Sequence, residues 1–173
     1  LPEVTGVMFG EGEETFLELM EHYHGEGKVL ADILGIAYRD RGEVCINEWR
    51  KTIDLSTVPF VYSDMEQFQN KIIYYESSRG CPFSCSYCLS SVDKCLRFRD
   101  LDLVKKELQF FIDAKVPQVK FVDRTFNCNH KHAMEIWQYL HTHDQGITNF
   151  HFEVAADLLN EEELSLIEKM RPG

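Results

Sequence analysis

The chain has 173 residues, of which 44% are hydrophobic, and this is enough for an ordinary globular domain with a core of its own. The formal net charge of −11 argues against a surface built to neutralise phosphates, so we expect no nucleic-acid partner. No apolar run approaches the roughly 18 residues of a membrane span, and the first residues lack the basic-then-apolar layout of a secretion signal. We therefore expect a cytoplasmic protein without a membrane partner.

Residues 1–51 are expected to form one helix and a hairpin. Residues 13–23 have an acidic first turn, which suits the positive end of a helix dipole, and an apolar stripe typical of a helix packed on a core. The stripe has the spacing i, i+3, i+4, i+7 and consists of Phe16, Leu19, Met20 and Tyr23. Two strands follow at residues 33–38 and 44–46, joined by a turn with Gly42 near its end.

Residues 52–70 show no clean periodicity and include Pro59, so we interpret them as a linker. The chain is thus expected to have three parts, which are residues 1–51, the linker 52–70 and residues 71–173. It begins at Leu1 rather than at a methionine and ends just beyond a helical pattern, so we expect it to be a piece of a longer protein.

From residue 71 onward the pattern of strand, loop and helix occurs three times, with strands expected at 71–76, 119–122 and 150–154. The first two helices carry apolar stripes, made of Leu101, Val104, Leu108, Phe111 and Ile112 in one and of Ala133, Ile136, Trp137 and Leu140 in the other. The third helix follows an N-cap at Asn160 with Glu163 three residues later. Three strand–helix units in succession predict an α/β fold with a parallel sheet and right-handed crossovers.

Polar residues follow all three expected strands at the point where each strand ends. The cysteine-rich segment 81–88 follows the first strand, residues 123–125 follow the second, and either Asp157 or Glu153 leaves the third. Parallel α/β folds place their sites at this carboxyl edge, so we expect these residues to lie together there. For Asp123 and Arg124, a local ion pair or a turn is an equally open interpretation.

Cys81, Cys85 and Cys88 stand at Cx3CxxC spacing in one compact loop that contains Gly80 and Pro82. Such a loop can turn three thiolates toward a common point, and thiolates are the usual ligands of iron–sulfur clusters. Three ligands on a four-iron cluster leave one iron open to a substrate or cofactor. The alternative is a structural zinc loop, although structural zinc sites usually combine two ligand pairs.

The remaining cysteines and the histidines carry less information. Cys45 and Cys128 are interpreted as small buried hydrophobic residues, and Cys95 is left open because it lies near the loop. A ferredoxin-type site would need Cys95 as its fourth ligand, out of step with the spacing of that class. Three histidine pairs have i, i+2 spacing, which places the members of a pair on different helix faces, so a pair cannot readily share a metal ion. We therefore favour solvated surface positions over metal ligands for His22, His24, His130, His132, His141 and His143. His151 is expected to be a polar strand position.

The cysteine loop, with the aromatic Tyr87 before its last cysteine, resembles the signature of the radical S-adenosylmethionine superfamily. Taken with segments 10–16, 58–60, 121–127 and 152–157, the chain is similar to the cobalamin-associated branch of that superfamily. This branch includes proteins of the magnesium-protoporphyrin IX monomethyl ester oxidative cyclase type. The similarity covers most of the chain, and the cysteine loop is its most specific part.

The resemblance implies an enzyme in which a [4Fe-4S] cluster on Cys81, Cys85 and Cys88 cleaves S-adenosylmethionine to a 5′-deoxyadenosyl radical that modifies a substrate. Oxidative cyclisation of a tetrapyrrole and methyl transfer are the reaction types it suggests. It also implies cofactor contacts, and these fall on Tyr87, Asp123, Arg124, Thr125, Glu153 and Asp157. Of these, Tyr87 would contact the adenine region, and residues 123–125 are assigned by position because they replace the Gly-Gly-Glu of the family. A non-enzymatic, zinc-stabilised interaction domain is the alternative.

The resemblance further implies that residues 71–173 are the first half of a parallel (β/α) barrel and that residues 1–51 are the C-terminal remnant of a Rossmann-like cobalamin domain. The chain contains no Asp-x-His-x-x-Gly cobalamin loop, so cobalamin binding cannot be assigned to this piece, and whether the full-length protein binds cobalamin is left open. The implied partners are a small-molecule substrate of unknown identity and a reductase such as flavodoxin or ferredoxin.

Overall fold

The computed structural model describes residues 3–68, 71–89 and 94–172 of the chain. The chain divides into two compact units, Leu1–Ile53 and Asp54–Gly173. Among the described residues, no helix is both long and apolar enough to cross a membrane.

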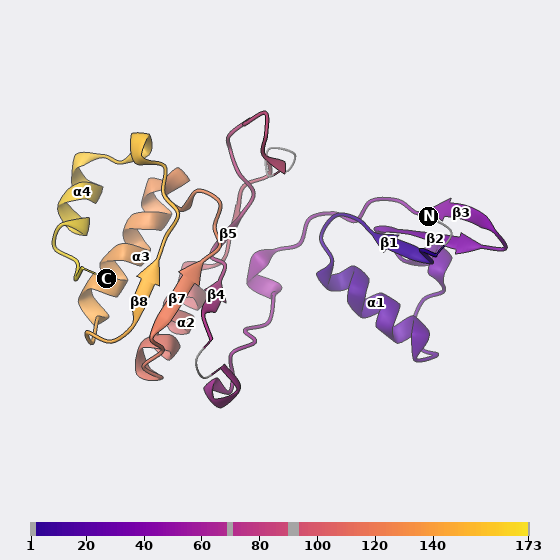
Figure 1. The fold of residues 1–173 in the computed structure, drawn as a ribbon, viewed down its shortest axis with the longest axis horizontal. Coiled ribbons are helices and arrows are strands. Elements are labelled where there is room, and N and C mark those ends of the chain that lie inside the picture. Colours follow the sequence, from indigo (N-terminus) through magenta and orange to yellow (C-terminus); the bar gives the residue numbers. More distant parts are fainter. Residues whose placement is uncertain (1–2, 69–70, 90–93, 173) are drawn as a thin grey trace. The chain divides into compact units, whose positions relative to one another are not determined.

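The first unit consists of one helix and a three-stranded antiparallel sheet of order β1-β2-β3 (Figure 1). Its elements are β1 (Gly6–Met8), α1 (Glu13–Tyr23), β2 (Ile36–Asp40) and β3 (Glu43–Ile46). The predicted helix and hairpin are confirmed, and the hairpin turn uses positive φ at both Arg41 and Gly42, as tight two-residue turns require. Strand β1 was not predicted. A Rossmann-like remnant would have parallel strands, so the described part of this unit does not show that topology.

Helix α1 buries a different residue from those predicted. Phe16 is 56% exposed and Tyr23 is 70% exposed, whereas Thr15 is fully buried. Thr15 donates a hydrogen bond to the carbonyl of Leu34 at 3.0 Å and accepts one from Arg50 Nε. Arg50 also pairs with Glu18, one turn along the same face. The spacing of apolar residues predicted the helix correctly. The buried hydrogen bonds of Thr15, one position before Phe16, determine which face of the helix turns inward.

The second unit is built on a parallel three-stranded sheet of order β4-β7-β8 with helices between the strands (Figure 1). Its main elements are β4 (Ile73–Tyr75), α2 (Leu101–Asp113), β7 (Gln118–Phe121), α3 (His130–His143), β8 (Asn149–His151) and α4 (Glu161–Ile167). The predicted α/β class with a parallel sheet and three strand–helix units is confirmed. The described strands form an open sheet, and a barrel is not seen among them.

One face of this sheet is buried against α2 and α3. Ile73 pairs with Val119, and Tyr75 pairs with Phe121, and all four side chains are at most 5% exposed. The helix stripes predicted from the sequence supply the other half of this core. The opposite face of the sheet carries three residues that pair across its strands: Tyr74, Lys120 and His151. Tyr74 is 53% exposed on this face.

The segment interpreted as a linker is mostly part of the second unit. Phe60, Tyr62, Met65 and Phe68 pack against its core, and the rings of Phe60 and Tyr62 each lie 5.4 Å from that of Phe111. Periodicity reports regular elements only, so an irregular segment that packs its aromatic side chains on a helix gives no periodic signal.

Candidate functional site

The cysteine loop is closed at its base by a short hairpin. Strand β5 (Ser78–Arg79) begins three residues after β4 ends, and it pairs antiparallel with β6 (Arg97–Phe98) (Figure 1). Ser78 lies opposite Phe98, and Arg79 lies opposite Arg97. The loop therefore leaves the sheet at the carboxyl edge, as predicted. Residues 90–93 of this loop lie outside the described residues.

Gly80 allows the two limbs of the loop to approach each other closely. The incoming limb runs through β5, and the outgoing limb runs through β6. Its φ is +98°, and a Cβ at this position would lie 2.5 Å from the carbonyl oxygen of Cys95 and 3.1 Å from Cα of Leu96. A side chain would therefore collide with backbone that cannot rotate away. Only glycine fits here, directly before the first cysteine.

The three predicted ligands differ in exposure. Cys81 is 8% exposed with its Sγ 3.9 Å from Oγ1 of Thr125, Cys88 is half-buried and Cys85 is exposed. The backbone N–H of Cys88 donates to the carbonyl of Cys85 at 3.2 Å, which forms a tight turn between them. All three are thiols rather than disulfides, so the donor set suits an iron–sulfur cluster.

No three side chains of His, Cys, Asp or Glu converge on a common point within the described ranges. Order in metal-binding loops often comes from the metal itself, because the ligands are brought together by binding. The assignment of Cys81, Cys85 and Cys88 as cluster ligands therefore stays a prediction.

Asp123 follows β7 and ties that strand to the base of the cysteine loop. Its carboxylate, 1% exposed, accepts hydrogen bonds from the backbone N–H of Ser77 at 3.0 Å, from Oγ of Ser77 at 2.7 Å and from Oγ of Ser78 at 2.6 Å. Burial raises the pKa of this carboxyl, and the three hydrogen bonds oppose that rise. The structure thus shows a local structural role for Asp123, and its predicted cofactor contact stays a prediction.

His132 meets the same serine from helix α3. It is 5% exposed, its Nε2 lies 3.1 Å from Oγ of Ser77, and its ring centroid lies 4.7 Å from that of Phe98. Burial lowers the pKa of His132 to about 4. The prediction of a surface histidine was wrong here: i, i+2 spacing does separate His132 from His130, but it turns His132 inward. Its position next to Ala133 in the buried stripe was the signal that could have identified it.

The loops after β7 and β8 are also joined. Asn127, fully buried, donates from Nδ2 to the carbonyl of Ala155 and accepts from the N–H of Ala155, both at 2.9 Å. The N–H of Phe126 donates to the carbonyl of Glu153 at 2.9 Å. With the Asp123 contacts, hydrogen bonds therefore connect the rim from the cysteine loop to the third strand.

The other predicted cofactor residues lie at this rim with different exposure. Thr125 is buried beside Cys81, whereas Tyr87 is 91% exposed. Three further residues are exposed: Arg124, Glu153 and Asp157. The carboxylate of Glu153 lies 3.4 Å from the ammonium group of Lys120 on the neighbouring strand. Their predicted roles in binding S-adenosylmethionine stay predictions.

A buried ion pair, which the sequence did not reveal, anchors the outgoing limb of the loop. Arg99, next to β6, donates to Glu107 of α2 from Nε at 2.9 Å and from Nη2 at 2.5 Å, and it also donates to the carbonyl of Leu55. Tyr75 OH donates to the same carboxylate at 2.6 Å. These hydrogen bonds raise the pKa of Arg99, and burial together with Glu107 raises the pKa of Tyr75. The carboxylate thus holds the hairpin, the sheet and helix α2 together.

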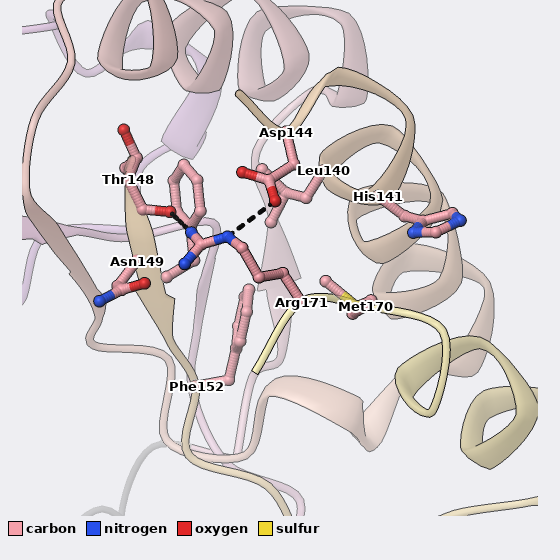
Figure 2. A pocket seen from close by; sticks show the side chains of 9 residues that line it. Leu140, His141, Asp144, Thr148, Asn149, Phe152, Met170 and Arg171 are labelled. Atoms are coloured by element: carbon pink, nitrogen blue, oxygen red, sulfur yellow. Dashed lines mark hydrogen bonds and ion pairs between the residues drawn. The ribbon is translucent and has the colours of Figure 1, made fainter. Parts of the chain in front are cut away.

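A separate pocket lies at the opposite edge of the sheet. Figure 2 shows Arg171 between Asp144 and Thr148, where its Nε donates to the Asp144 carboxylate and its Nη2 to the Thr148 carbonyl, both at 2.9 Å. The lining residues come from the end of α3, from β8 and its flanks, and from the segment after α4. None of the predicted site residues lines this pocket.

Two curated relatives match the chain in sequence. It is 32% identical over 145 residues to an uncharacterized methyltransferase of Pyrococcus horikoshii, a match that covers 78% of this chain and 31% of the relative. It is also 32% identical over 121 residues to a putative methylthiotransferase of Methanocaldococcus jannaschii, covering 67% of this chain and 25% of the relative. The chain therefore spans a third or less of the length of these relatives. No family model matches it.

Solved structures of two enzymes share the fold. The cobalamin-dependent S-adenosylmethionine radical enzyme OxsB, with aqua-cobalamin and S-adenosylmethionine bound, matches 95% of this chain with a TM-score of 0.71 and 23% identity, over 25% of its own length. The radical S-adenosylmethionine methyltransferase TsrM from Kitasatospora setae, with cobalamin and a [4Fe-4S] cluster bound, matches 95% of this chain with a TM-score of 0.67 and 18% identity, over 36% of its own length.

These findings confirm the resemblance of the chain to the radical S-adenosylmethionine superfamily and, within it, to the cobalamin branch. The fold is the one found in OxsB and TsrM.

Proposed function

We propose that the chain is the cluster-binding core of a radical S-adenosylmethionine enzyme, with Cys81, Cys85 and Cys88 as ligands of a [4Fe-4S] cluster. One observation carries this proposal: the Cx3CxxC loop stands on a hairpin at the carboxyl edge of a parallel sheet, with Cys81 buried against Thr125 of the next strand's loop. When bound, such a cluster supplies the electron that cleaves the sulfonium of S-adenosylmethionine.

The residues of this chain would bind and orient the cofactor. The guanidinium of Arg124 is exposed beside the buried Asp123 and Thr125, and it suits a carboxylate such as that of the methionine moiety. The exposed ring of Tyr87 offers a flat surface for adenine. Glu153 and Asp157, exposed at the third strand, could accept hydrogen bonds from the amino group or the ribose.

We further propose that the three strand–helix units are part of a larger (β/α) barrel. The face of the sheet that carries Tyr74, Lys120 and His151 is polar and open, as the inner face of an incomplete barrel would be. The remaining strands and any cobalamin site would belong to the rest of the protein.

For the reaction, transfer of a methyl or methylthio group is better supported than oxidative cyclisation of a tetrapyrrole. The relatives in P. horikoshii and M. jannaschii carry the names of a methyltransferase and a methylthiotransferase, and TsrM is a methyltransferase. The zinc-stabilised interaction domain has no support from these comparisons. A flavodoxin or ferredoxin as electron donor and a small-molecule substrate remain part of the proposal.

Anaerobic reconstitution with iron and sulfide tests this function. The proposal predicts about four iron atoms per chain and a broad thiolate–iron absorbance near roughly 400 nm. Replacing Cys81, Cys85 and Cys88 with alanine should abolish both. The matched control replaces Cys45, Cys95 and Cys128 and should retain them. A colourless wild-type protein that holds one zinc ion would contradict the proposal and favour the zinc domain.

A further inference from the structure

We infer that Asp123 and His132 are positioning residues of the cysteine loop: together they clamp its base against the sheet and helix α3, and so set where the cysteines stand. This inference rests on the proposed function of the loop. It concerns residues that do not ligate the cluster but act through Ser77 and Ser78.

The direction of each hydrogen bond in the clamp can be assigned. Ser77 has one hydroxyl proton, and it goes to the Asp123 carboxylate at 2.7 Å. Ser77 Oγ can therefore only accept from His132, which fixes the proton of that imidazole on Nε2. The backbone N–H of Ser77 also donates to Asp123, while its carbonyl accepts from the N–H of Arg99 at 2.9 Å. Every hydrogen-bonding group of Ser77 is thus used.

The clamp holds both limbs of the hairpin. Asp123 binds Ser77 and Ser78 on the incoming limb, and the ring of His132 lies against Phe98 on the outgoing limb. Since Ser78 pairs with Phe98, the clamp acts on the last paired positions of the hairpin.

The distance from the clamp to the first cysteine is short. Cys81 follows Ser78 by three residues, a reach of about 10 Å when extended, and Gly80 is packed tightly against Cys95 on the way. A movement of the β5–β6 hairpin at the base of the loop should therefore also displace the Cys81 thiol. Buried polar networks of this kind tolerate little loss, because an unpaired buried group costs free energy that cannot be recovered from water.

The same helix offers a matched control. His130, two residues before His132, forms a 2.8 Å contact through Nδ1 with the fully buried carboxylate of Glu163 in α4. This is also a contact between an imidazole and a buried hydrogen-bonded network, but it joins α3 to α4 rather than to the cysteine loop. Variants at Glu163 should therefore report general destabilisation of the unit without an effect on the loop.

The test compares Asp123→Asn, His132→Ala, His132→Gln and Glu163→Gln in the whole chain by two measurements. The first is iron retained after anaerobic reconstitution and challenge with a chelator. The second is hydrogen exchange of amides 81–89 and 118–121 in the metal-free protein. We expect Asp123→Asn and His132→Ala to weaken iron retention about tenfold, within the range for residues that orient metal ligands, and to speed exchange at 81–89 but not at 118–121. His132→Gln, whose amide can donate to Ser77, should restore much of the loss, and Glu163→Gln should keep wild-type iron.

Wild-type iron retention and unchanged exchange at 81–89 in His132→Ala would overturn the inference, and so would equal iron loss in Glu163→Gln. If the wild-type chain binds no cluster, the proposed function fails. The exchange measurement on metal-free protein then still decides whether Asp123 and His132 order the loop.

Discussion

Gly80 and Cys95 lie so close that a Cβ on residue 80 would stand 2.5 Å from the Cys95 carbonyl oxygen. Gly80→Ala should therefore force the limbs of the cysteine loop apart and abolish most iron binding. Gly146→Ala is the control, because Gly146 also has a positive φ, of 75°, but a Cβ there would meet open space. We expect the control to cost about 1 kcal/mol from backbone strain alone and to keep its iron. Equal iron binding in the two variants would show that the close approach is not needed.

The stability of the chain should depend on pH through His132. Burial lowers its pKa from 6.5 to about 4, so between these values the unfolded chain binds more protons than the folded one. Above pH 6.5 the pKa shift of His132 does not lower the free energy of unfolding. As the pH falls toward 4, the free energy of unfolding decreases by up to about 3 kcal/mol, since one pKa unit corresponds to about 1.36 kcal/mol. The raised pKa of Asp123 acts in the opposite direction. Urea unfolding of wild type and His132→Gln at pH 7.5 and pH 5 measures the contribution of the histidine. The free energy of unfolding should fall less between pH 7.5 and pH 5 in the variant than in wild type.

The buried pair of Arg99 and Glu107 should matter far more to stability than a surface pair. Glu107→Ala leaves the Arg99 charge and the Tyr75 hydroxyl without their shared acceptor, and we expect a cost of about 3–5 kcal/mol in the free energy of unfolding. The control is Glu135→Ala, which breaks the partly exposed pair with Lys105 and should cost less than about 1 kcal/mol. Chemical denaturation gives both values, and similar costs would contradict the anchoring role of Glu107.

Tyr87 should contribute to cofactor binding and not to folding. Its side chain is 91% exposed, so Tyr87→Ala should leave the melting temperature unchanged. If its ring stacks on adenine, the substitution should weaken binding of S-adenosylmethionine to the reconstituted protein about tenfold, since stacking on a base contributes about 1–3 kcal/mol. Tyr23→Ala, at a residue 70% exposed in the first unit, should leave the affinity unaltered. Calorimetric titration distinguishes these outcomes.

Much of the fold could be predicted because it depends on local periodicity. The structure confirms three features predicted from the sequence: the α2 stripe from Leu101 to Ile112, the α3 stripe and the Asn160 capping box. These signals need only neighbouring residues on one helix, and the strand–helix order then implied the parallel sheet.

The base of the candidate site could not be predicted in the same way. Strands β5 and β6 have two residues each, which is too short for any period to show. The contacts of Ser77 with Asp123 and His132 span 46 and 55 residues, and hydrogen bonds between polar side chains leave no pattern in a single sequence. Helix α1 shows the same limit, since the contacts of Thr15 with Leu34 and Arg50 set its inward face.

The electron paramagnetic resonance spectrum of the reduced, reconstituted chain, with and without S-adenosylmethionine, tests the central claim most directly. Three cysteine ligands leave one iron able to bind the cofactor, so we predict a four-iron cluster signal that changes when S-adenosylmethionine is added. The change should be lost in Cys81→Ala and retained in Cys95→Ala. A cluster signal that is identical with and without S-adenosylmethionine, or the absence of any cluster from the wild-type chain, would contradict the account.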